Sequence, residues 1–333
     1  MVTKKSFESI NDLLKQKRIA LLIPCYNEEL TIEQVINDFR NAMPGIIIYV
    51  FDNNSTDRTA KLARNSGAIV YSVHERGKGN VVRKMFREID SDLYVLVDGD
   101  STYYADDIIN LLKTYIEFQP DMVVGNRLLH YEDNAFRRMH MFGNKLISKI
   151  VSILFRVNLK DVLSGFRLLT KRVVDNLYIK SSNFEVETEI TLQALKQKFS
   201  IAEVPIKYRS RPEGSKSKLN TFLDGVLIFK TIFMIFRDYK PLVFFGTLSL
   251  ITFLCGLVFG FFPVCDYIKY KYVYHVPLAI LSASLEILAV SFLMVALILD
   301  TIVNYNAELN FKITKLREEL DKIKDDKRIF KNR

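Results

Sequence analysis

Hydrophobic positions in the first two hundred residues form short, nearly continuous runs, separated by segments with helical spacing. The runs are RIALLIP (18–24), IIIYVFD (46–52), AIVYSV (68–73), LYVLVD (93–98) and DMVVG (121–125). Strands that are apolar on both faces and alternate with helices are typical of a parallel sheet covered by helices on both sides. The pattern therefore predicts a doubly wound α/β domain. In such sheets ligands bind beyond the carboxyl ends of the strands, and we expect the chemistry there.

A different pattern begins after residue 240. The run 241–264 contains no charged residue; as a helix it spans roughly 36 Å, which exceeds a hydrocarbon core of about 30 Å. The run 276–299 contains one charge, Glu286, which is costly against lipid and is therefore expected to face a neighbouring helix. The joining segment DYIKYKYVYH is rich in tyrosine, as at a membrane interface. The pattern predicts a transmembrane hairpin.

Basic residues flank the two apolar runs and predict their orientation. Before the first run lie Lys207, Arg209, Arg211, Lys216, Lys218, Lys230, Arg237 and Lys240, and after the second lie Lys312, Lys315 and Arg317. Because basic residues are retained on the cytoplasmic side, we expect a two-span protein of the cell membrane with the α/β domain and both termini in the cytoplasm. The first eighteen residues lack the apolar core of a secretory signal peptide.

Amphipathic segments adjoin the predicted spans. In 216–240 apolar residues fall on one helical face, which suits a helix lying in the membrane surface, whereas 146–157 fits a membrane-surface helix and a core helix equally well. In the tail, 304–333, apolar residues recur at intervals of three and four, which predicts a cytoplasmic helix, either a short coiled coil or a solvated helix without a partner. The α/β domain then covers 1–215.

Composition narrows the function classes. The 333 residues include 47 Lys and Arg against 38 Asp and Glu, a net charge of +9, and 49% are hydrophobic, which excludes a disordered chain. The basic residues cluster beside the predicted spans and no motif that reads RNA or DNA is present, so we expect no nucleic-acid partner. Three scattered cysteines provide neither a disulfide framework nor a zinc site, which indicates a reducing compartment.

Polar side chains follow the predicted strands where the chemistry is expected. Asp98 and Asp100 place two carboxylates within reach of one hard cation that would neutralise a diphosphate, and we expect Gly99 between them to let the chain turn tightly. Asp52, at the end of its strand, can accept hydrogen bonds from a base or a ribose. The next polar residues, Ser55, Thr56 and Asp57, fit the cap of the following helix equally well.

These motifs, together with others farther along the chain, resemble a known family. From about Ile19 to Leu219 the sequence contains, in order, IPCYNEE, DNNSTD, RGKGN, DGD, GNR, SGFR, FEVETE, EVPIKYRSR and GSKSKL. It resembles the family-2 glycosyltransferases of GT-A fold, in the membrane-bound branch that loads sugars onto polyisoprenyl phosphates. The resemblance implies a Rossmann-like, doubly wound and mainly parallel sheet in a catalytic domain, and two following spans occur in several members.

The resemblance implies a donor half of the site. Residues that match positions around the nucleotide base and ribose are Pro24, Tyr26, Glu28 and Asp52. Lys78, in RGKGN, brings positive charge near the donor diphosphate, although this motif also fits a turn that starts the next helix.

The resemblance also implies a metal cofactor. Asp98 and Asp100 match the motif that holds Mg²⁺ or Mn²⁺ on the donor diphosphate. Thr102 stands where mannosyltransferase relatives have a Gln in the metal shell, which leaves the third protein ligand open.

An acceptor half is expected to carry positive charge, because a lipid monophosphate has close to two negative charges at neutral pH. The residues that match phosphate-contacting positions of the family are Arg127, Arg138, Arg211 and Lys218. Arg137 adjoins Arg138 and can take its role, and Lys216 is an alternative to Lys218.

Asp161, in DVLSGFR, matches the carboxylate proposed as catalytic base in relatives. A phosphate monoester, with a second pKa near 6, is already a competent nucleophile at neutral pH. Asp161 is therefore expected either to accept the residual proton or to orient the acceptor phosphate. Direct attack of the lipid phosphate on the anomeric carbon, with Asp100 contributing through the metal, inverts the configuration.

The function implied is a membrane-bound, inverting glycosyltransferase that moves one sugar from a nucleotide-diphosphate sugar to undecaprenyl or dolichyl phosphate, with a dimer or tetramer as its plausible assembly. RGKGN, DGDSTY and FEVETE favour a UDP-linked donor, and a GDP-mannose-dependent enzyme is the alternative. A processive synthase would use Q-x-x-R-W, and the chain has no Trp. An inactive membrane scaffold is the alternative of another class, and the intact acidic and basic motifs oppose it.

Overall fold

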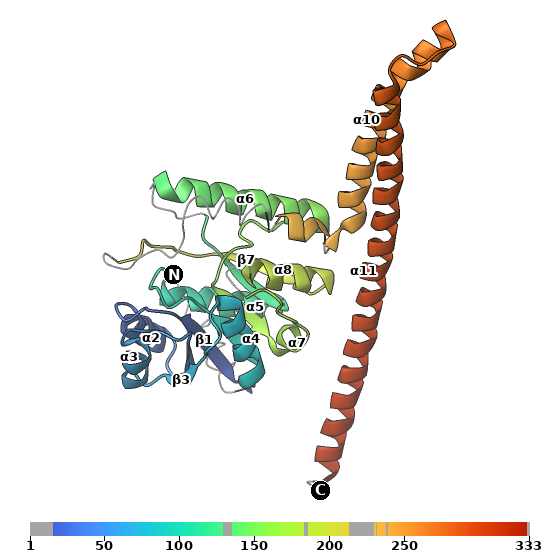
Figure 1. Cartoon of the computed structure of the whole chain (residues 1–333). Coiled ribbons are helices and arrows are strands. Elements are labelled where there is room, and N and C mark those ends of the chain that lie inside the picture. The colour runs from blue at the N-terminus through green and yellow to red at the C-terminus, as the bar shows by residue number, and fades with distance from the viewer. Residues whose placement is uncertain are drawn as a thin grey trace. The chain divides into compact units, whose positions relative to one another are not determined.

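The computed structural model describes residues 16–128, 135–182, 186–212, 230, 232–237 and 239–331. The chain divides into two compact units, Met1–Ile228 and Phe229–Arg333. The first contains the sheet and the second contains two long helices (Figure 1).

The first unit is built on a seven-stranded sheet with the order β3-β2-β1-β4-β6-β5-β7. Its strands are β1 Ile19–Cys25, β2 Ile47–Asp52, β3 Ile69–Ser72, β4 Leu93–Leu96, β5 Met122–Asn126, β6 Arg167–Thr170 and β7 Ile201–Pro205. Only β6 runs antiparallel, between β4 and β5. This confirms the doubly wound, mainly parallel sheet and all five predicted strands.

The strands β6 and β7 were not predicted. The strand β6 is four residues long, and β7 is half-exposed along most of its length, so neither gives the continuous apolar run of a central strand. The strand β6 joins β4 to β5 inside the sheet, and β7 forms its far edge.

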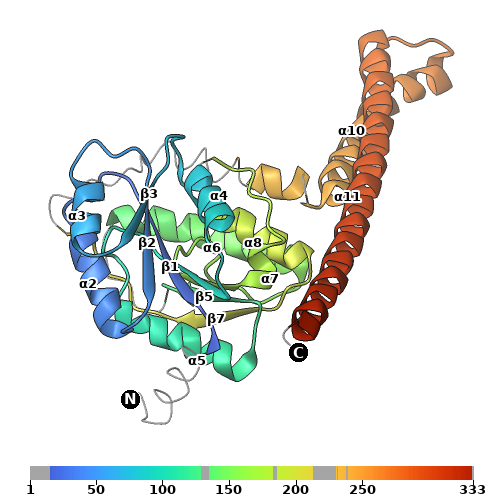
Figure 2. The same ribbon diagram turned by 90° about the horizontal axis from the view of Figure 1, so that it is seen from below.

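Helices cover both faces of the sheet (Figure 2). One apolar cluster joins the sheet to α2 Ile32–Ala42, α3 Thr59–Asn65, the short turn η1 Ala105–Asp107 and α5 Ile108–Phe118. The other joins it to α4 Lys78–Glu88, α7 Lys171–Val174 and α8 Val186–Lys196. In β1, Leu21 and Ile23 belong to the first cluster and Ala20 and Leu22 to the second, as expected for side chains that alternate across a strand.

The topology brings the loops of the expected site to one edge. The strands β1, β2, β4, β5 and β7 point the same way, because the antiparallel β6 pairs with both β4 and β5. Segments that leave the ends of these strands, and the segment that enters β6, therefore lie at the same edge of the sheet.

The helix α6, Ala135–Phe155, includes all but the last two residues of the segment 146–157 (Figure 1). On it Ile147 and Val151 are buried, while Phe142 and Ile153 are exposed. The buried side is that of a core helix. Contact of the exposed side with a membrane stays a prediction.

The second unit contains α10 Pro241–Tyr270 and α11 Val276–Lys331. Within them Pro241–Tyr270 and Val276–Asn306, with mean hydropathies of 2.4 and 2.3, are long and apolar enough to cross a membrane. Both predicted runs are therefore helical, and α10 continues several residues beyond the predicted end at 264. The predicted interfacial helix 216–240 lies largely outside the described residues.

The connection and the tail differ from the prediction. Much of the tyrosine-rich joining segment belongs to α10, and the remaining turn closes on Asp266, whose carboxylate accepts a hydrogen bond from the Tyr274 backbone N–H at 3.0 Å and lies 2.7 Å from His275 Nδ1. The tail is not a separate helix, because α11 runs without a break through residue 331. No glycine or proline follows Pro277 to end it.

Polar and small residues join the two long helices. Ser249 Oγ donates to the Ala289 carbonyl at 2.7 Å, and Ser282 Oγ donates to the Gly256 carbonyl at 2.8 Å. Glu286 lies against Gly256, which confirms that it faces the neighbouring helix. Among the described residues its buried Oε1 has no hydrogen-bond partner. Small residues thus allow the close approach typical of membrane helices.

Gly256→Val is expected to weaken the hairpin. A Cβ at this position would lie 2.5 Å from Glu286 Oε1, and overpacking of this kind costs about 1–3 kcal/mol. Thermal unfolding of the full chain in detergent measures the effect. Gly246→Val is the matched control, since a Cβ there meets nothing within 4 Å. Equal melting temperatures for the two variants would contradict the packing argument.

Candidate functional site

The loops after β1 and β2 are tied together by side-chain hydrogen bonds. The backbone N–H of Asn27 donates to Ser55 Oγ at 2.9 Å, and the Thr56 N–H donates to Asn27 Oδ1 at 2.8 Å. Asp57 Oδ1 accepts from the Thr59 N–H at the start of α3, at 2.9 Å. The cap position of α3 is Arg58, which has no side-chain cap hydrogen bond, so the predicted cap is wrong in position. Asp57 binds the start of the helix from one residue earlier, and the neighbouring Ser55 and Thr56 connect the two loops.

Asp52 ends β2 with a carboxylate that is only partly satisfied. The residue is 6% exposed, and Oδ2 accepts from the Ser55 N–H at 3.3 Å. Its buried Oδ1 has no hydrogen-bond partner among the described residues. A buried acceptor without a donor is costly, so this oxygen suits a ligand hydroxyl or N–H group.

The other predicted nucleotide residues lie at the same edge of the sheet. Glu28 is buried in the loop after β1, and the Arg76 guanidinium stacks over the Tyr26 ring at 5.6 Å. Pro24, near the end of β1, lines a small cavity together with Lys78 and Asp98. The loops after β1, β2 and β4 thus gather the predicted donor residues.

Lys78 lies between two carboxylates. Its Nζ is 2.5 Å from Asp98 Oδ1 and also forms an ion pair with Glu187, and the side chains of Lys78 and Glu187 are 13% and 9% exposed. Burial disfavours both charged forms of the Lys78–Asp98 pair, but their mutual attraction outweighs it. The pKa of Asp98 therefore lies below its ordinary value and the pKa of Lys78 above.

The RGKGN motif forms the turn that starts the next helix, one of the two interpretations that the sequence allowed, and its role at a diphosphate stays a prediction. Gly77 has a φ of 118°, which favours glycine, and its N–H donates to Asn53 Oδ1 at 2.7 Å. The helix α4 starts at the next residue, Lys78. The turn thus starts the helix and sends the ammonium group to Asp98.

Glu187 was not singled out from the sequence. It lies in the first turn of α8, where an acidic residue is ordinary because it stabilises the helix dipole. The motif FEVETE was noticed only as a whole. The contact with Lys78 depends on the packing of α4 against the start of α8.

Two glycines are required by close packing around the acidic motif. A Cβ at Gly165 would lie 2.6 Å from Asp98 Oδ2, and a Cβ at Gly99 would lie 2.6 Å from Cys25 Sγ. Gly99 does not adopt a left-handed conformation, whereas Ser101, with a φ of 59°, does. Gly99 lies in a turn, as expected, but the close approach of Cys25, rather than a special φ angle, is what requires a glycine there.

Asp100 is buried and held by neighbours on both oxygens. Oδ1 accepts from Thr102 Oγ1 at 2.6 Å, and Oδ2 accepts from Arg211 Nη2 at 2.6 Å. Arg211 follows the bridge between Tyr103 and Tyr208, which lays this segment along the acidic motif. Burial opposes the charge of Arg211, but the nearby carboxylates of Asp100 and Glu28 raise its pKa.

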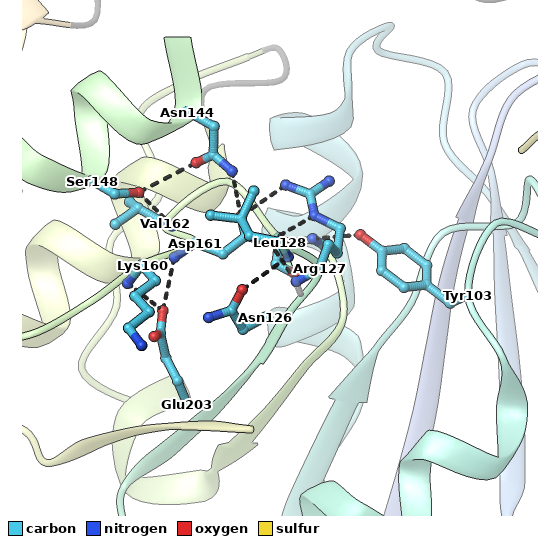
Figure 3. Close-up of polar contacts among 12 residues, drawn as sticks. Tyr103, Asn126, Arg127, Leu128, Asn144, Ser148, Lys160, Asp161, Val162 and Glu203 are labelled. Carbon is cyan, nitrogen blue, oxygen red and sulfur yellow. Dashed lines mark hydrogen bonds and ion pairs between the residues drawn. The ribbon is translucent and has the colours of Figure 1, made fainter. Parts of the chain in front are cut away.

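Asp161 and Arg127 form a buried bidentate ion pair (Figure 3). Arg127 Nε donates to Oδ2 at 2.8 Å, Nη2 donates to Oδ1 at 2.9 Å, and the Arg127 backbone N–H also donates to Oδ2 at 2.9 Å. Asn144 Nδ2 adds a hydrogen bond to Oδ1 at 2.7 Å. The side chain of Asp161 is fully buried. Burial raises the pKa of Asp161, but the attraction of the Arg127 guanidinium outweighs burial and holds this pKa below its ordinary value.

The segment around Asp161 is held by further hydrogen bonds. The backbone N–H groups of Lys160 and Asp161 both donate to Glu203 Oε1 at 2.8 Å, and the Val162 N–H donates to Ser148 Oγ at 3.1 Å (Figure 3). Asp161 is therefore fixed from α6 and β7 as well as by Arg127.

The structure thus places three of the predicted acids beside basic side chains. The pairs are Asp98 with Lys78, Asp100 with Arg211, and Asp161 with Arg127. The side chains of Arg138 and Lys218 lie outside the described residues.

The carboxylates at this edge of the sheet suit a hard divalent cation whose other ligands come from water and from a phosphate group. Asp98 and Asp100 supply carboxylate oxygens from one short segment. No group of three or more His, Cys, Asp or Glu residues suited to a metal occurs among the described residues. Mg²⁺ is often bound by one or two carboxylates, with the remaining ligands from water and substrate phosphates. Two carboxylates are therefore enough for such a site.

Comparison with known proteins decides the family. The model of glycosyl transferase family 2 matches residues 20–178. Protein RfbJ of Shigella flexneri is 52% identical over 122 residues, which cover 37% of this chain and 95% of that protein. The chain belongs to glycosyltransferase family 2. The resemblance noted from the motifs is thereby confirmed.

Two archaeal relatives of this glycosyltransferase cover more of the chain. Glycosyltransferase AglJ of Haloferax volcanii is 29% identical over 299 residues, covering 90% of this chain and 98% of that protein. The UDP-N-acetylglucosamine–dolichyl-phosphate N-acetylglucosaminyltransferase of Methanococcus voltae is 28% identical over 249 residues, covering 67% of this chain and 97% of that protein.

Among solved structures, the fold is similar to that of glucosyl-3-phosphoglycerate synthase from Mycobacterium tuberculosis, in complex with Mn²⁺, UDP and glucosyl-3-phosphoglycerate. The TM-score is 0.57 at 20% identity, over 69% of this chain and 82% of that one. The similarity supports the GT-A fold of the sheet unit of this glycosyltransferase.

Asp161→Asn is expected to destabilise this glycosyltransferase by about 3–5 kcal/mol at pH 7, because it leaves Arg127 buried without a counter-charge. Since the folded pKa of Asp161 is lowered, its stabilisation is present above the unfolded pKa of about 3.9 and is lost as the pH falls through the folded value. Chemical unfolding from pH 7 down to pH 3 measures both effects.

Asp106→Asn, at an exposed carboxylate on the same domain, is the control and should change stability little. A difference between wild type and Asp161→Asn that stays constant down to pH 3 would contradict the electrostatic origin.

Proposed function

We propose that this glycosyltransferase moves one sugar from a nucleotide-diphosphate sugar to a polyisoprenyl phosphate, undecaprenyl or dolichyl phosphate, at the cytoplasmic face of the cell membrane. The observation that carries the proposal is the set of three ion pairs at one edge of the sheet, which combines carboxylates for a cation with basic groups for phosphates. Two helices long enough to span a membrane support a lipid acceptor.

A UDP-linked donor is favoured. The Methanococcus voltae relative is named for a UDP-sugar and dolichyl phosphate, and the similar Mycobacterium tuberculosis structure contains UDP. Among the described residues no group donates a hydrogen bond to the buried Asp52 Oδ1, which suits a base or ribose group. Pro24, Tyr26 and Glu28 complete the proposed nucleotide site. A GDP-mannose donor is the alternative.

The proposed cofactor is Mg²⁺ or Mn²⁺, held by Asp98 and Asp100. When bound, it would neutralise the charge that develops on the departing nucleoside diphosphate. Lys78, beside Asp98, supplies a further positive charge for the diphosphate. Mn²⁺ in the similar Mycobacterium tuberculosis structure supports a metal of this class.

The acceptor phosphate is proposed to bind Arg127 and Arg211, with Arg138 and Lys218 as further sequence-based candidates. The two described arginines combine permanent charge with several N–H donors, which suits a phosphate. The Arg127 guanidinium stacks over the Tyr208 ring at 5.4 Å, and the Asp161 carboxylate fixes it from another side. The chain therefore holds at least one phosphate-binding group in a defined orientation.

The geometry favours a positioning role for Asp161 over base catalysis. Its carboxylate is fully buried, accepts four hydrogen bonds and has a lowered pKa, so it is a poor proton acceptor near neutrality. A phosphate monoester is largely dianionic at neutral pH and needs no strong base. Its oxygen attacks the anomeric carbon as the bond to the nucleoside diphosphate breaks. This single displacement inverts the configuration.

The proposed domain arrangement follows the sequence. The catalytic domain covers 1–215, an interfacial helix 216–240, the spans 241–264 and 276–299, and the tail 304–333. The flanking basic residues favour cytoplasmic termini. A homodimer or homotetramer stays a prediction.

Asp100→Ala is expected to lower sugar transfer at least about a hundredfold, because one of two proposed cation ligands is lost. The assay uses the full chain in detergent with undecaprenyl or dolichyl phosphate, Mn²⁺ or Mg²⁺, and a panel of UDP- and GDP-sugars, and mass spectrometry identifies the lipid product. Asp106→Asn is the control. Wild type that transfers no sugar to either lipid from any donor would favour the inactive scaffold.

Asp161→Asn is expected to reduce turnover by the same factor at pH 6 and pH 9, because the carboxylate stays ionised throughout this range. The measurement is kcat against pH for wild type and variant under conditions where both remain folded. A loss that is much larger at pH 6, where part of the acceptor phosphate still carries its residual proton, than at pH 9 would instead indicate base catalysis by Asp161.

A further inference from the structure

Lys78 has a second counter-charge that its proposed role does not require. One carboxylate beside its ammonium group is Asp98, a proposed metal ligand, and the other is Glu187, from the start of α8. Both acids line the same small cavity, which also includes the buried Arg167. Two acidic and two basic side chains therefore share one enclosed space.

Backbone contacts join the start of α4, which carries Lys78, to residues 181 and 182. The Gly79 N–H donates to the Ser182 carbonyl at 3.1 Å, and a Cβ at Gly79 would lie 2.0 Å from the Ser181 carbonyl oxygen. The start of α4 is thus packed directly against the segment that precedes α8. This backbone contact does not involve Asp98.

The second carboxylate beside Lys78 becomes important when Asp98 binds a cation. If Asp98 were the sole counter-charge of Lys78, a cation on that carboxylate would compete with the ammonium for the same oxygens. A buried ammonium without a counter-charge is costly. Glu187 provides a counter-charge on the other side of Lys78, so the ammonium can remain in place.

We propose that Glu187 is a positioning residue that holds the Lys78 ammonium at the donor diphosphate while Asp98 binds the metal. The inference rests on the proposed donor and metal sites and adds a residue to them. Without Glu187, a cation on Asp98 would leave the Lys78 ammonium with no carboxylate to hold it at the diphosphate.

Neutralising Glu187 should change the affinity for the diphosphate in the direction opposite to that expected from charge alone. Removing a negative charge near an anion site would by Coulomb's law strengthen the binding of the anion. Glu187→Gln is expected to weaken the binding of the anion instead, because the Lys78 ammonium is no longer held in place at the diphosphate. The loss should concern the β-phosphate, so UDP is affected and UMP is nearly unaffected.

The experiment is isothermal titration of the folded full-length protein in detergent with UDP and with UMP, in the presence of Mn²⁺. Wild type, Glu187→Gln, Lys78→Met and the double variant are compared. Glu187→Gln and Lys78→Met should each bind UDP about tenfold more weakly, the size of one charge-assisted hydrogen bond. The double variant should bind UDP no more weakly than Lys78→Met, since Glu187 acts through Lys78.

Two further variants separate positioning from a structural effect. Glu187→Asp keeps the charge and should recover part of the UDP affinity. Glu88→Gln alters an exposed acid at the far end of α4 and should leave the difference between UDP and UMP unchanged. Circular dichroism confirms that each variant is folded.

UDP binding by Glu187→Gln that equals or exceeds that of wild type would overturn the proposal. A further tenfold loss of UDP affinity in the double variant, compared with Lys78→Met, would also overturn it. If wild type binds GDP in place of UDP, the series with GDP and GMP decides the matter by the same criteria. Wild type that binds neither nucleotide with Mn²⁺ would overturn the donor site itself, and with it this inference.

Discussion

The site depends on the cost of burying charge. Asp98, Asp100 and Asp161 are buried or half-buried at one edge of the sheet, and each has a basic side chain within hydrogen-bond distance. Breaking such a pair costs more than the pair contributes, because the remaining charge stays buried. The elements around the site therefore have to hold both partners, which explains why the ion pairs connect segments far apart in the sequence.

The topology of the sheet makes these pairs possible. The antiparallel β6 lies between β4 and β5, so the segment that enters β6 carries Asp161 to the edge from which Arg127 leaves β5. The segment after β7 returns along the acidic motif and brings Arg211 to Asp100. A sheet without β6 and β7 would still have the loops after β1, β2 and β4, but not the Arg127–Asp161 and Arg211–Asp100 ion pairs.

Backbone proximity is the second constraint. Gly99 packs against Cys25, Gly165 against Asp98, and Gly79 against the Ser181 carbonyl, and in each place a Cβ would come within 2.6 Å of another atom. Gly256 has the same role in the second unit, where it accommodates Glu286. In these four places the absence of a side chain, rather than a special φ angle, is the property that the structure uses.

The sequence by itself determined the elements whose signals are local. The continuous apolar runs predicted five strands and two long apolar helices, because burial on both faces of a strand or along a whole helix leaves a direct composition signal. The polar motifs at the strand ends indicated Asp52, Asp98 and Asp100 and, through family resemblance, the glycosyltransferase chemistry. The short β6, the half-exposed β7 and the unbroken α11 were missed, since their extents depend on neighbours or on the absence of a helix-breaking residue.

Only the tertiary structure decided which charges face each other. Asp161 could have been a solvent-exposed base, but its four hydrogen bonds come from Arg127 and from Asn144 on α6, and no sequence spacing specifies that contact. Glu187 resembled an ordinary helix-start acid until the packing of α4 on α8 placed it beside Lys78. Ion pairs act over a few ångströms between residues far apart along the chain, so their partners are fixed by the fold and not by the local pattern.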